Sequence, residues 1–203
     1  MARRLLLASN NAKKLIELRS LLAPLGVELL AQGELAIPEA EEPFGSFVEN
    51  ALAKARHAAR ASGLPALADD SGLAVDALAG MPGVRSARYA LDAGEGQGDE
   101  ANNALLLKRL AGVEQRGARF VCALVALRHA DDPEPLIATG RWPLLVLQAA
   151  EGSGGFGYDP IVQAQGFAGS VASLDAAVKN AHSHRARAMQ ALIAQLQDSW
   201  EWR

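Results

Sequence analysis

The chain has 203 residues, half of them hydrophobic, and a formal net charge of −3. That length suits one domain, or two small lobes that share one chain. The lone cysteine, Cys122, excludes an internal disulfide and favours a reducing compartment. The slight negative charge argues against a nucleic-acid coat or a protein that binds anionic membranes through its overall charge.

No segment approaches the roughly 18 uncharged apolar residues that a membrane-spanning helix needs. Arg3-Arg4 followed by the apolar run 5–8 resembles the start of a signal peptide, but the run is too short and polar residues follow it at once. We therefore expect a cytoplasmic protein with no membrane segment and no nucleic-acid partner, in which residues 5–8 form a buried strand.

Strands and helices alternate in the first part of the predicted fold. Leucines at helical spacing predict a helix over 12–22, which ends before Pro24 and Gly26. Ser46 and Glu49 form a capping box that opens a second helix, running to about residue 62. Strands are expected at 5–8, at 27–30 and up to 68, with Asp69-Asp70-Ser71-Gly72 ending the third.

The remaining elements complete a mixed sheet. The continuous apolar run 120–127 predicts a strand buried on both faces, and 136–147 predicts its partner. Asp99 is expected to cap a helix that reaches about residue 111, and Ser183 to cap a last helix with one apolar stripe. The whole pattern predicts an α/β fold with a mixed β-sheet.

Four stretches place polar residues at the ends of predicted elements. The first lies between the first strand and the first helix and comprises Ser9, Asn10, Asn11, Ala12, Lys13 and Lys14. Free backbone amides at a helix N-terminus attract anions, and a nearby lysine adds positive charge. A solvated helix start with surface lysines is the alternative that the sequence leaves open.

Two acidic pairs form the second candidate. Glu41-Glu42 and Asp69-Asp70 lie outside the predicted regular elements and offer carboxylates of the kind that Mg²⁺ binds. An ordinary acidic loop is the alternative for the first pair. For the second pair, adjacent like charges destabilise a strand end unless a cation offsets them, which favours a site.

The third candidate is the glycine-rich loop 152–160, which carries Phe156 and Tyr158. Glycines let the backbone approach a ligand closely, and a base stacked on an aromatic ring gains about 1–3 kcal/mol. The loop matches neither the phosphate-binding loop nor the dinucleotide-binding pattern. A glycine-rich turn with an aromatic plug remains the alternative.

The fourth candidate is Lys179 with Ser183, His184 and Arg185, for which a capped surface helix is the alternative. Other polar residues are interpreted as structural. Cys122 is expected to be a buried thiol within a strand. Lys54, in the charged segment 54–60, is expected to lie on a solvated helix face. Together the four stretches indicate a nucleotide bound with Mg²⁺.

Six short motifs, in order along the chain, resemble those of the inosine/xanthosine triphosphate pyrophosphatases, which remove non-standard purine nucleoside triphosphates. The motifs are Ser9-Asn-Asn-Ala-Lys-Lys14, Phe47-Val-Glu-Asn-Ala51 with Lys54-Ala55, Asp69-Asp-Ser-Gly-Leu-Ala-Val75, Gly80-Met-Pro-Gly-Val84 with Ser86-Ala-Arg-Tyr89, Gly155-Phe-Gly-Tyr-Asp-Pro-Ile161, and Lys179 with Ser183-His-Arg185. The resemblance extends from near residue 5 to near residue 195.

This resemblance implies an elongated α/β fold, in which a mixed sheet in two lobes, with flanking helices and a central active-site cleft, forms one domain over 1–203. It implies a homodimer and a reaction that depends on Mg²⁺. The implied reaction hydrolyses ITP, dITP or XTP to the nucleoside monophosphate and pyrophosphate, which cleanses the nucleotide pool.

The resemblance also implies a role for each matching residue. Asp70 would be the catalytic base and, with Glu42, a metal ligand. A water polarised by Mg²⁺ and oriented by Asp70 would attack the α-phosphorus in line. The triphosphate would contact Ser9, Asn11, Lys14, Ser71 and Lys179, with Asn10, Ala12 and Lys13 beside them. The nucleoside would contact Phe156, Gly157, Tyr158, Asp159, His184 and Arg185.

The chain departs from the family pattern in several loops. Asn10 and Ala186 each replace a usual glycine, Pro143-Leu144-Leu145 replaces Gly-x-Ile, and Ser170–Leu174 replaces Thr-x-Ala-Glu-Leu. Every residue assigned to chemistry is retained, so we expect effects on loop geometry and purine preference rather than on the reaction. One alternative is a non-catalytic nucleotide-binding regulatory protein on the same fold. The other is a pyrophosphatase for standard nucleoside triphosphates or for modified pyrimidine nucleotides.

Overall fold

A computed structural model describes residues 3–202, so positions 1, 2 and 203 of the predicted domain lie outside the described residues. The strands are β1 (Arg3–Leu7), β2 (Val27–Ala31), β3 (Ala66–Val75), β4 (Gly117–Leu127), β5 (Leu136–Val146) and β6 (Val162–Ala164). The helices are α1 (Ala12–Leu22), α2 (Phe47–Ser62), α3 (Tyr89–Asp92), α4 (Gly98–Arg109), α5 (Ala176–His182) and α6 (His184–Ser199).

The strands pair into one six-stranded sheet in the order β2-β1-β3-β4-β5-β6. β1 runs parallel to β2 and to β3, whereas β5 and β6 are antiparallel. The predicted α/β class with a mixed sheet is therefore confirmed. Within residues 3–202, no helix combines the length and the apolar character needed to cross a bilayer.

The chain folds into two compact units, which we call unit 1 and unit 2. Among the described residues, unit 1 comprises those up to Asp70, Cys122–Gly140 and those from Arg185 onward. Unit 2 comprises Ser71–Val121 and Arg141–His184. Strands β3, β4 and β5 each contribute residues to both units.

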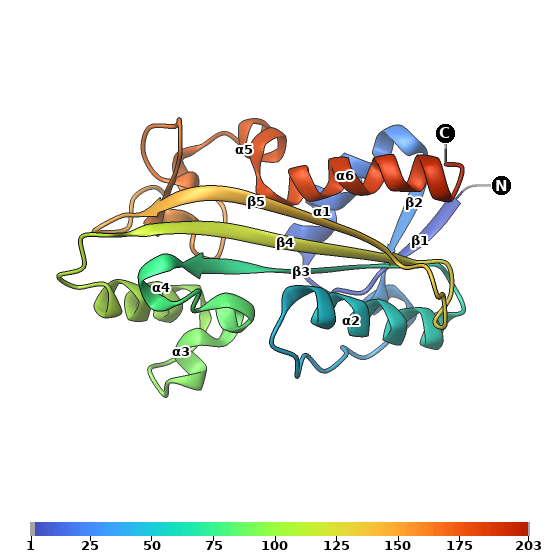
Figure 1. The fold of residues 1–203 in the computed structure, drawn as a ribbon, viewed down its shortest axis with the longest axis horizontal. Helices are drawn as coiled ribbons and strands as arrows, with labels where there is room; N and C mark the ends of the chain where they lie inside the picture. Colours follow the sequence, from blue (N-terminus) through green and yellow to red (C-terminus); the bar gives the residue numbers. More distant parts are fainter. Residues whose placement is uncertain (1–2, 203) are drawn as a thin grey trace. The chain divides into compact units, whose positions relative to one another are not determined.

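Unit 1 buries an apolar cluster on each face of its strands. Side chains alternate along a strand, so Leu5 and Leu7 of β1 join one cluster and Leu6 joins the other. Helices α1 and α6 cover the first cluster through residues such as Leu18 and Met189. Helix α2 covers the opposite face with small alanines, and Figure 1 shows α2 and α6 on opposite sides of these strands.

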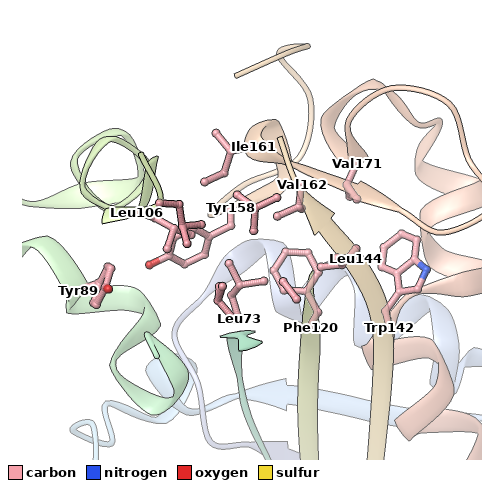
Figure 2. Close-up of a cluster of buried hydrophobic side chains, with 14 of the residues drawn as sticks. Leu73, Tyr89, Leu106, Phe120, Trp142, Leu144, Tyr158, Ile161, Val162 and Val171 are labelled. Carbon is pink, nitrogen blue, oxygen red and sulfur yellow. The ribbon is translucent and has the colours of Figure 1, made fainter. Parts of the chain in front are cut away.

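Unit 2 has its own apolar core, shown in Figure 2. Leu73, Phe120 and Trp142 enter it from β3, β4 and β5, and Leu106 enters it from α4. Tyr158 is 5% exposed and its ring lies beside Leu106 in Figure 2. The loop that carries Tyr158 is therefore anchored in the core rather than laid on the surface.

Three local predictions need correction. The third strand does not end at Ala68, as predicted, but continues as β3 to Val75, because the carboxylates of Asp69 and Asp70 both meet cations. Asp99 is not a cap: α4 begins at Gly98 after Gln97, and the Asp99 carboxylate accepts a hydrogen bond from Gly157 N instead. The short β6 and α5 were not predicted, because three and seven residues are too few for a clear periodic pattern.

The connection between β4 and β5 is organised by Asp132, whose side chain is 1% exposed. Asp132 Oδ2 accepts from the backbone N and Nε of Arg128, and Oδ1 accepts from Glu134 N. Burial would raise the pKa of Asp132, but the two backbone donors and Arg128 lower it below its ordinary value of 3.8.

We therefore predict that Asp132→Asn lowers the free energy of unfolding at pH 7 by about 1–3 kcal/mol, because the loop donors lose a charged acceptor. A lowered native pKa stabilises the fold above the ordinary pKa, and that contribution disappears as the pH falls through the native value. Urea unfolding of both proteins from pH 7 down to acid measures the effect. A deficit that does not shrink in acid, or an equal loss in the exposed neighbour variant Asp131→Asn, would contradict it.

Candidate functional site

The start of α1 is built from side chains that hold its own backbone. Ser9 Oγ accepts from Asn11 N at 3.2 Å, and Asn11 Oδ1 caps the helix by accepting from Lys14 N at 3.1 Å. Asn10 donates to Glu39 at 3.2 Å, while Ala12 and Lys13 are exposed. The predicted first stretch is thus an ordered helix N-terminus whose outer residues face solvent, the geometry that favours an anion.

Lys14 turns inward and meets the first of the two adjacent aspartates. Its Nζ lies 2.9 Å from Asp69 Oδ1, and Arg185 Nε lies 2.6 Å from Asp69 Oδ2. Arg185 also pairs with Glu17 on α1. Cys122, a buried thiol as predicted, has its Sγ 3.8 Å from Asp69 Oδ2.

These partners decide the ionisation of Asp69, whose side chain is fully buried. Burial alone would raise the pKa of Asp69, but Arg185 and Lys14 lower it well below its ordinary value. Arg185 shows the converse: burial would lower its pKa, and Asp69 raises it above the ordinary value. The two cations, from α1 and α6, therefore favour the ionised form of Asp69.

The second aspartate lies on the opposite face of β3 with different partners. Lys54 Nζ on α2 is 2.9 Å from Asp70 Oδ1 and 2.7 Å from Glu42 Oε1. Burial raises the pKa of Asp70 above its ordinary value, and Lys54 offsets only part of that effect. Burial would lower the pKa of Lys54, but Asp70 and Glu42 raise it above its ordinary value.

Asn50 fixes the acidic loop next to this pair. Its Oδ1 accepts from Phe44 N and its Nδ2 donates to Phe44 O, so one fully buried amide satisfies both backbone groups of Phe44. Glu42 precedes Phe44 by two residues and is therefore held close to Lys54 by a loop with a fixed end. Glu41 is exposed and makes no such contact in the described part of the chain.

The Glu42–Asp70 pair is suited to a hard divalent cation. Both carboxylates lie within hydrogen-bond distance of one ammonium group, so a small cation that replaced or joined that ammonium would meet two oxygen ligands. Mg²⁺ typically takes one or two protein carboxylates and completes its shell with water and substrate phosphates. Among the described residues, no three His, Cys, Asp or Glu side chains form an all-protein metal cage.

Loop 152–160 in unit 2 is organised around one buried carboxylate. Asp159 Oδ2 accepts from Phe156 N at 2.8 Å and from Lys179 Nζ at 2.6 Å. Gly155 has φ +73°, and a Cβ there would lie 2.1 Å from Asp159 Oδ2, so this position requires glycine. Lys179 Nζ also lies 4.5 Å from the centre of the Phe156 ring. Asp159, Phe156 and Lys179 therefore form one local assembly.

The other predicted residues of unit 2 range from half-buried to buried. Tyr158 donates its hydroxyl proton to Ser86 O at 2.9 Å, and burial raises its pKa above the ordinary value. Tyr158 thus fills the core, as the aromatic-plug alternative held. His184 stacks on Phe120 with ring centres 4.8 Å apart, and Ser71 is half-buried on β3.

Sequence reasoning missed the role of Lys54, which is 9% exposed rather than solvated. Its buried neighbours Ala51, Ala55 and Ala58 are spaced as on one helix face, and Lys54 lies on that face. A lysine on an apolar stripe signals a buried partner. Glu17, and the pairing of Lys14 and Arg185 with Asp69, were also missed, because no local pattern links residues so far apart in the chain.

Comparison with known proteins identifies the family. The model of the Ham1 family matches residues 5–195 of this chain. The dITP/XTP pyrophosphatase of Leptothrix cholodnii is 59% identical over 97% of this chain and 98% of its own. The dITP/XTP pyrophosphatase of Ralstonia nicotianae is 58% identical over 96% of each chain. The structure of a HAM1 protein from Coxiella burnetii matches with a TM-score of 0.89 and 41% identity over 97% of this chain and 100% of that one.

The family model covers most of the chain, and the relatives share more than half of its residues. The chain belongs to the Ham1 family. The resemblance to nucleoside triphosphate pyrophosphatases stated from six motifs is confirmed.

We predict that Asp69→Asn lowers the free energy of unfolding by about 3–5 kcal/mol, because Arg185 and Lys14 would then share a buried site without their counter-charge. Urea unfolding at pH 7 measures the change. The matched control is Glu28→Gln, which removes a half-exposed pair with Arg4 and should cost less than about 1 kcal/mol. Equal losses in the two variants would show that the Asp69 network contributes no more than a surface ion pair.

Proposed function

We propose that this protein hydrolyses non-standard purine nucleoside triphosphates, ITP, dITP and XTP, to the monophosphate and pyrophosphate. The observation that carries the proposal is the Glu42–Lys54–Asp70 assembly, in which Lys54 and Asp70 are buried and Glu42 is half-buried. A carboxylate pair of this kind suits a metal-assisted attack on a phosphate ester or anhydride. Support also comes from the Ham1 relatives named dITP/XTP pyrophosphatase.

The polar group of unit 1 is proposed to bind the triphosphate. The α1 N-terminus offers the backbone amides and the side chains of Ser9 and Asn11, and Lys14 offers a positive charge. Asn10, Ala12 and Lys13 lie in the same turn and would contact the outer phosphates. Asp69 holds the Lys14 ammonium at a fixed place, so little side-chain entropy is lost when phosphate arrives.

Glu42 and Asp70 are the residues that would hold Mg²⁺. When bound there, the ion would neutralise phosphate charge and acidify the attacking water. Lys54 keeps the two carboxylates together and offsets their repulsion before substrate arrives. Its ammonium also competes for the same oxygens, which favours entry of the cation together with the nucleotide rather than alone.

Asp70 is proposed as the general base. Its carboxylate would accept a proton from the water that attacks the α-phosphorus. Burial raises the pKa of Asp70, which brings it nearer to the range in which a base both remains ionised and holds a proton well. Positioning and charge neutralisation supply most of the remaining rate enhancement, because phosphoryl transfer leaves the protein little covalent chemistry.

Unit 2 is proposed to bind the nucleoside and part of the phosphate chain. Phe156 and the backbone of Gly157 would face the nucleoside. Asp159 holds Lys179 beside the loop by accepting hydrogen bonds from Lys179 Nζ and from Phe156 N. Tyr158 acts from the core, as the anchor of this loop. Ser71 and Lys179 would contact phosphate oxygens.

Selection of the base is proposed to depend on donors that meet the purine 6-oxo group. His184 and Arg185 follow one another at the start of α6 and are the proposed donors. Adenine presents an amino group at that position, so a buried donor would lose its partner. Sites built on such hydrogen bonds discriminate by up to about 10⁴–10⁵.

We further propose that the protein works as a cytoplasmic homodimer that cleanses the nucleotide pool. The single cysteine, the buried Cys122, is consistent with a reducing compartment. A sedimentation mass of one 21.3-kDa chain would contradict the dimer.

The decisive experiment measures pyrophosphate release from ITP, XTP, dITP, ATP and GTP, each with Mg²⁺ and with EDTA. We expect Mg²⁺-dependent release from the first three, far above that from ATP and GTP. Equal release from all five would retain the reaction but refute selection at the 6-oxo group. Stoichiometric nucleotide binding without release would favour a non-catalytic regulatory protein.

We predict that Asp70→Asn lowers kcat for ITP by at least about 100-fold, because the attacking water loses its proton acceptor. Steady-state kinetics and circular dichroism on the purified variant measure the activity and the fold. Asp131→Asn, an exposed aspartate of the same unit, is the matched control and should keep wild-type kcat. Near-normal turnover by Asp70→Asn in a folded protein would refute the assignment of the base.

A further inference from the structure

Helix α4 holds the glycine loop of unit 2 by both backbone groups of one residue. Asp99 Oδ2 accepts from Gly157 N at 2.7 Å, and Asn103 Nδ2 donates to Gly157 O at 3.0 Å. The two side chains are four residues apart and therefore project from the same helix face. Together they satisfy the backbone N–H and the backbone C=O of Gly157.

Gly157 adopts a left-handed backbone conformation within this loop. It has φ +62° and separates Phe156 from Tyr158. Glycine-rich segments lose more conformational entropy on ordering than other segments do. Asp159 fixes the loop from within and Tyr158 anchors it in the core, but neither fixes the peptide groups of Gly157. The α4 side chains supply that restraint.

The hydrogen bond from Asn103 to Gly157 leaves the other polar atom of the Asn103 amide unsatisfied. Because a carbonyl can only accept, the amide must turn Nδ2 toward Gly157 O, and Oδ1 is left buried without a hydrogen-bond partner among the described residues. A buried unsatisfied acceptor destabilises the fold. An apolar side chain would avoid that cost, so the amide is explained by what it does to the loop rather than by what it adds to α4.

We propose that Asp99 and Asn103 are positioning residues that preorganise loop 155–159 for nucleoside binding. The inference rests on the proposed function, in which Phe156 and Gly157 face the nucleoside. Holding the loop in its binding conformation before substrate arrives removes an ordering cost from each binding event. The effect falls on substrate affinity, because the Glu42 and Asp70 carboxylates that act in the chemical step have other supports.

Four variants separate the loss of a hydrogen bond to Gly157 from a mere change of side chain on α4. Asp99→Ala removes the acceptor, whereas Asp99→Asn keeps an oxygen at the same place. Asn103→Asp is isosteric but sets a carboxylate against the Gly157 carbonyl. Glu100→Ala, beside Asp99 and exposed, is the matched control.

For ITP hydrolysis we expect Asp99→Ala and Asn103→Asp to raise KM by about tenfold or more, the scale of one hydrogen bond to a charged group. Their kcat should stay within about twofold, because transition-state contacts are unchanged. Asp99→Asn and Glu100→Ala should keep a near-wild-type KM. Unchanged KM in both disruptive variants, or a fall in kcat at constant KM, would overturn the proposal.

Amide hydrogen exchange at Gly157 tests the restraint without reference to catalysis. We expect the Gly157 N–H to be protected in the wild-type protein and to exchange about tenfold faster or more in Asp99→Ala, with other loop amides of the unit unchanged. An active wild-type enzyme with an unprotected Gly157 amide would refute positioning and leave the proposed function standing. A protected amide in a protein that releases no pyrophosphate would refute the proposed function and leave the restraint standing.

Discussion

The structure of unit 1 depends on the neutralisation of two adjacent carboxylates on β3. Because successive side chains of a strand point to opposite faces, Asp69 faces α1 and α6 while Asp70 faces α2. Each aspartate therefore meets different cations, and the repulsion expected of neighbouring charges is offset separately on each face. The same alternation divides the apolar residues of unit 1 into two clusters, so the charges and the core follow one geometric rule.

The different surroundings give the two aspartates different chemistry. Asp69 is fully buried between Lys14 and Arg185, its pKa is held low, and its role is to fix those cations. Asp70 has one cation, Lys54, which it shares with Glu42, and burial keeps its pKa raised. Pairs of titratable groups whose environments separate their pKa values commonly divide the work of a site between them. Asp69 is thus suited to holding Lys14 and Arg185 in place, whereas the raised pKa of Asp70 is consistent with its proposed role as general base.

In the glycine loop of unit 2, it is backbone groups rather than charges that are satisfied by other residues. Asp159 holds the loop from within, Tyr158 anchors it, and α4 restrains Gly157 from outside. Only Asp159 and Tyr158 could be marked in advance, because they lie inside the recognisable motif. Asp99 and Asn103 belong to a helix more than fifty residues earlier in the chain. Asp99 is also a residue type that is common at helix N-caps, which is how the sequence was interpreted.

The sequence by itself determined the class of fold, the first two helices and the family, because periodic apolar residues, caps and contiguous motifs are local signals. It also marked the acidic pairs Glu41-Glu42 and Asp69-Asp70, from which the family resemblance selected Glu42 and Asp70. The tertiary structure alone decided that β3 continues through its two aspartates, that Lys54 is buried, and that Asp99 faces a loop rather than its own helix end. For β3 and Lys54 the physical reason is that a charge is stable in a buried position only when a partner satisfies it. The partners of the two aspartates, of Lys54 and of the exposed Asp99 lie elsewhere in the chain, and no local pattern names them.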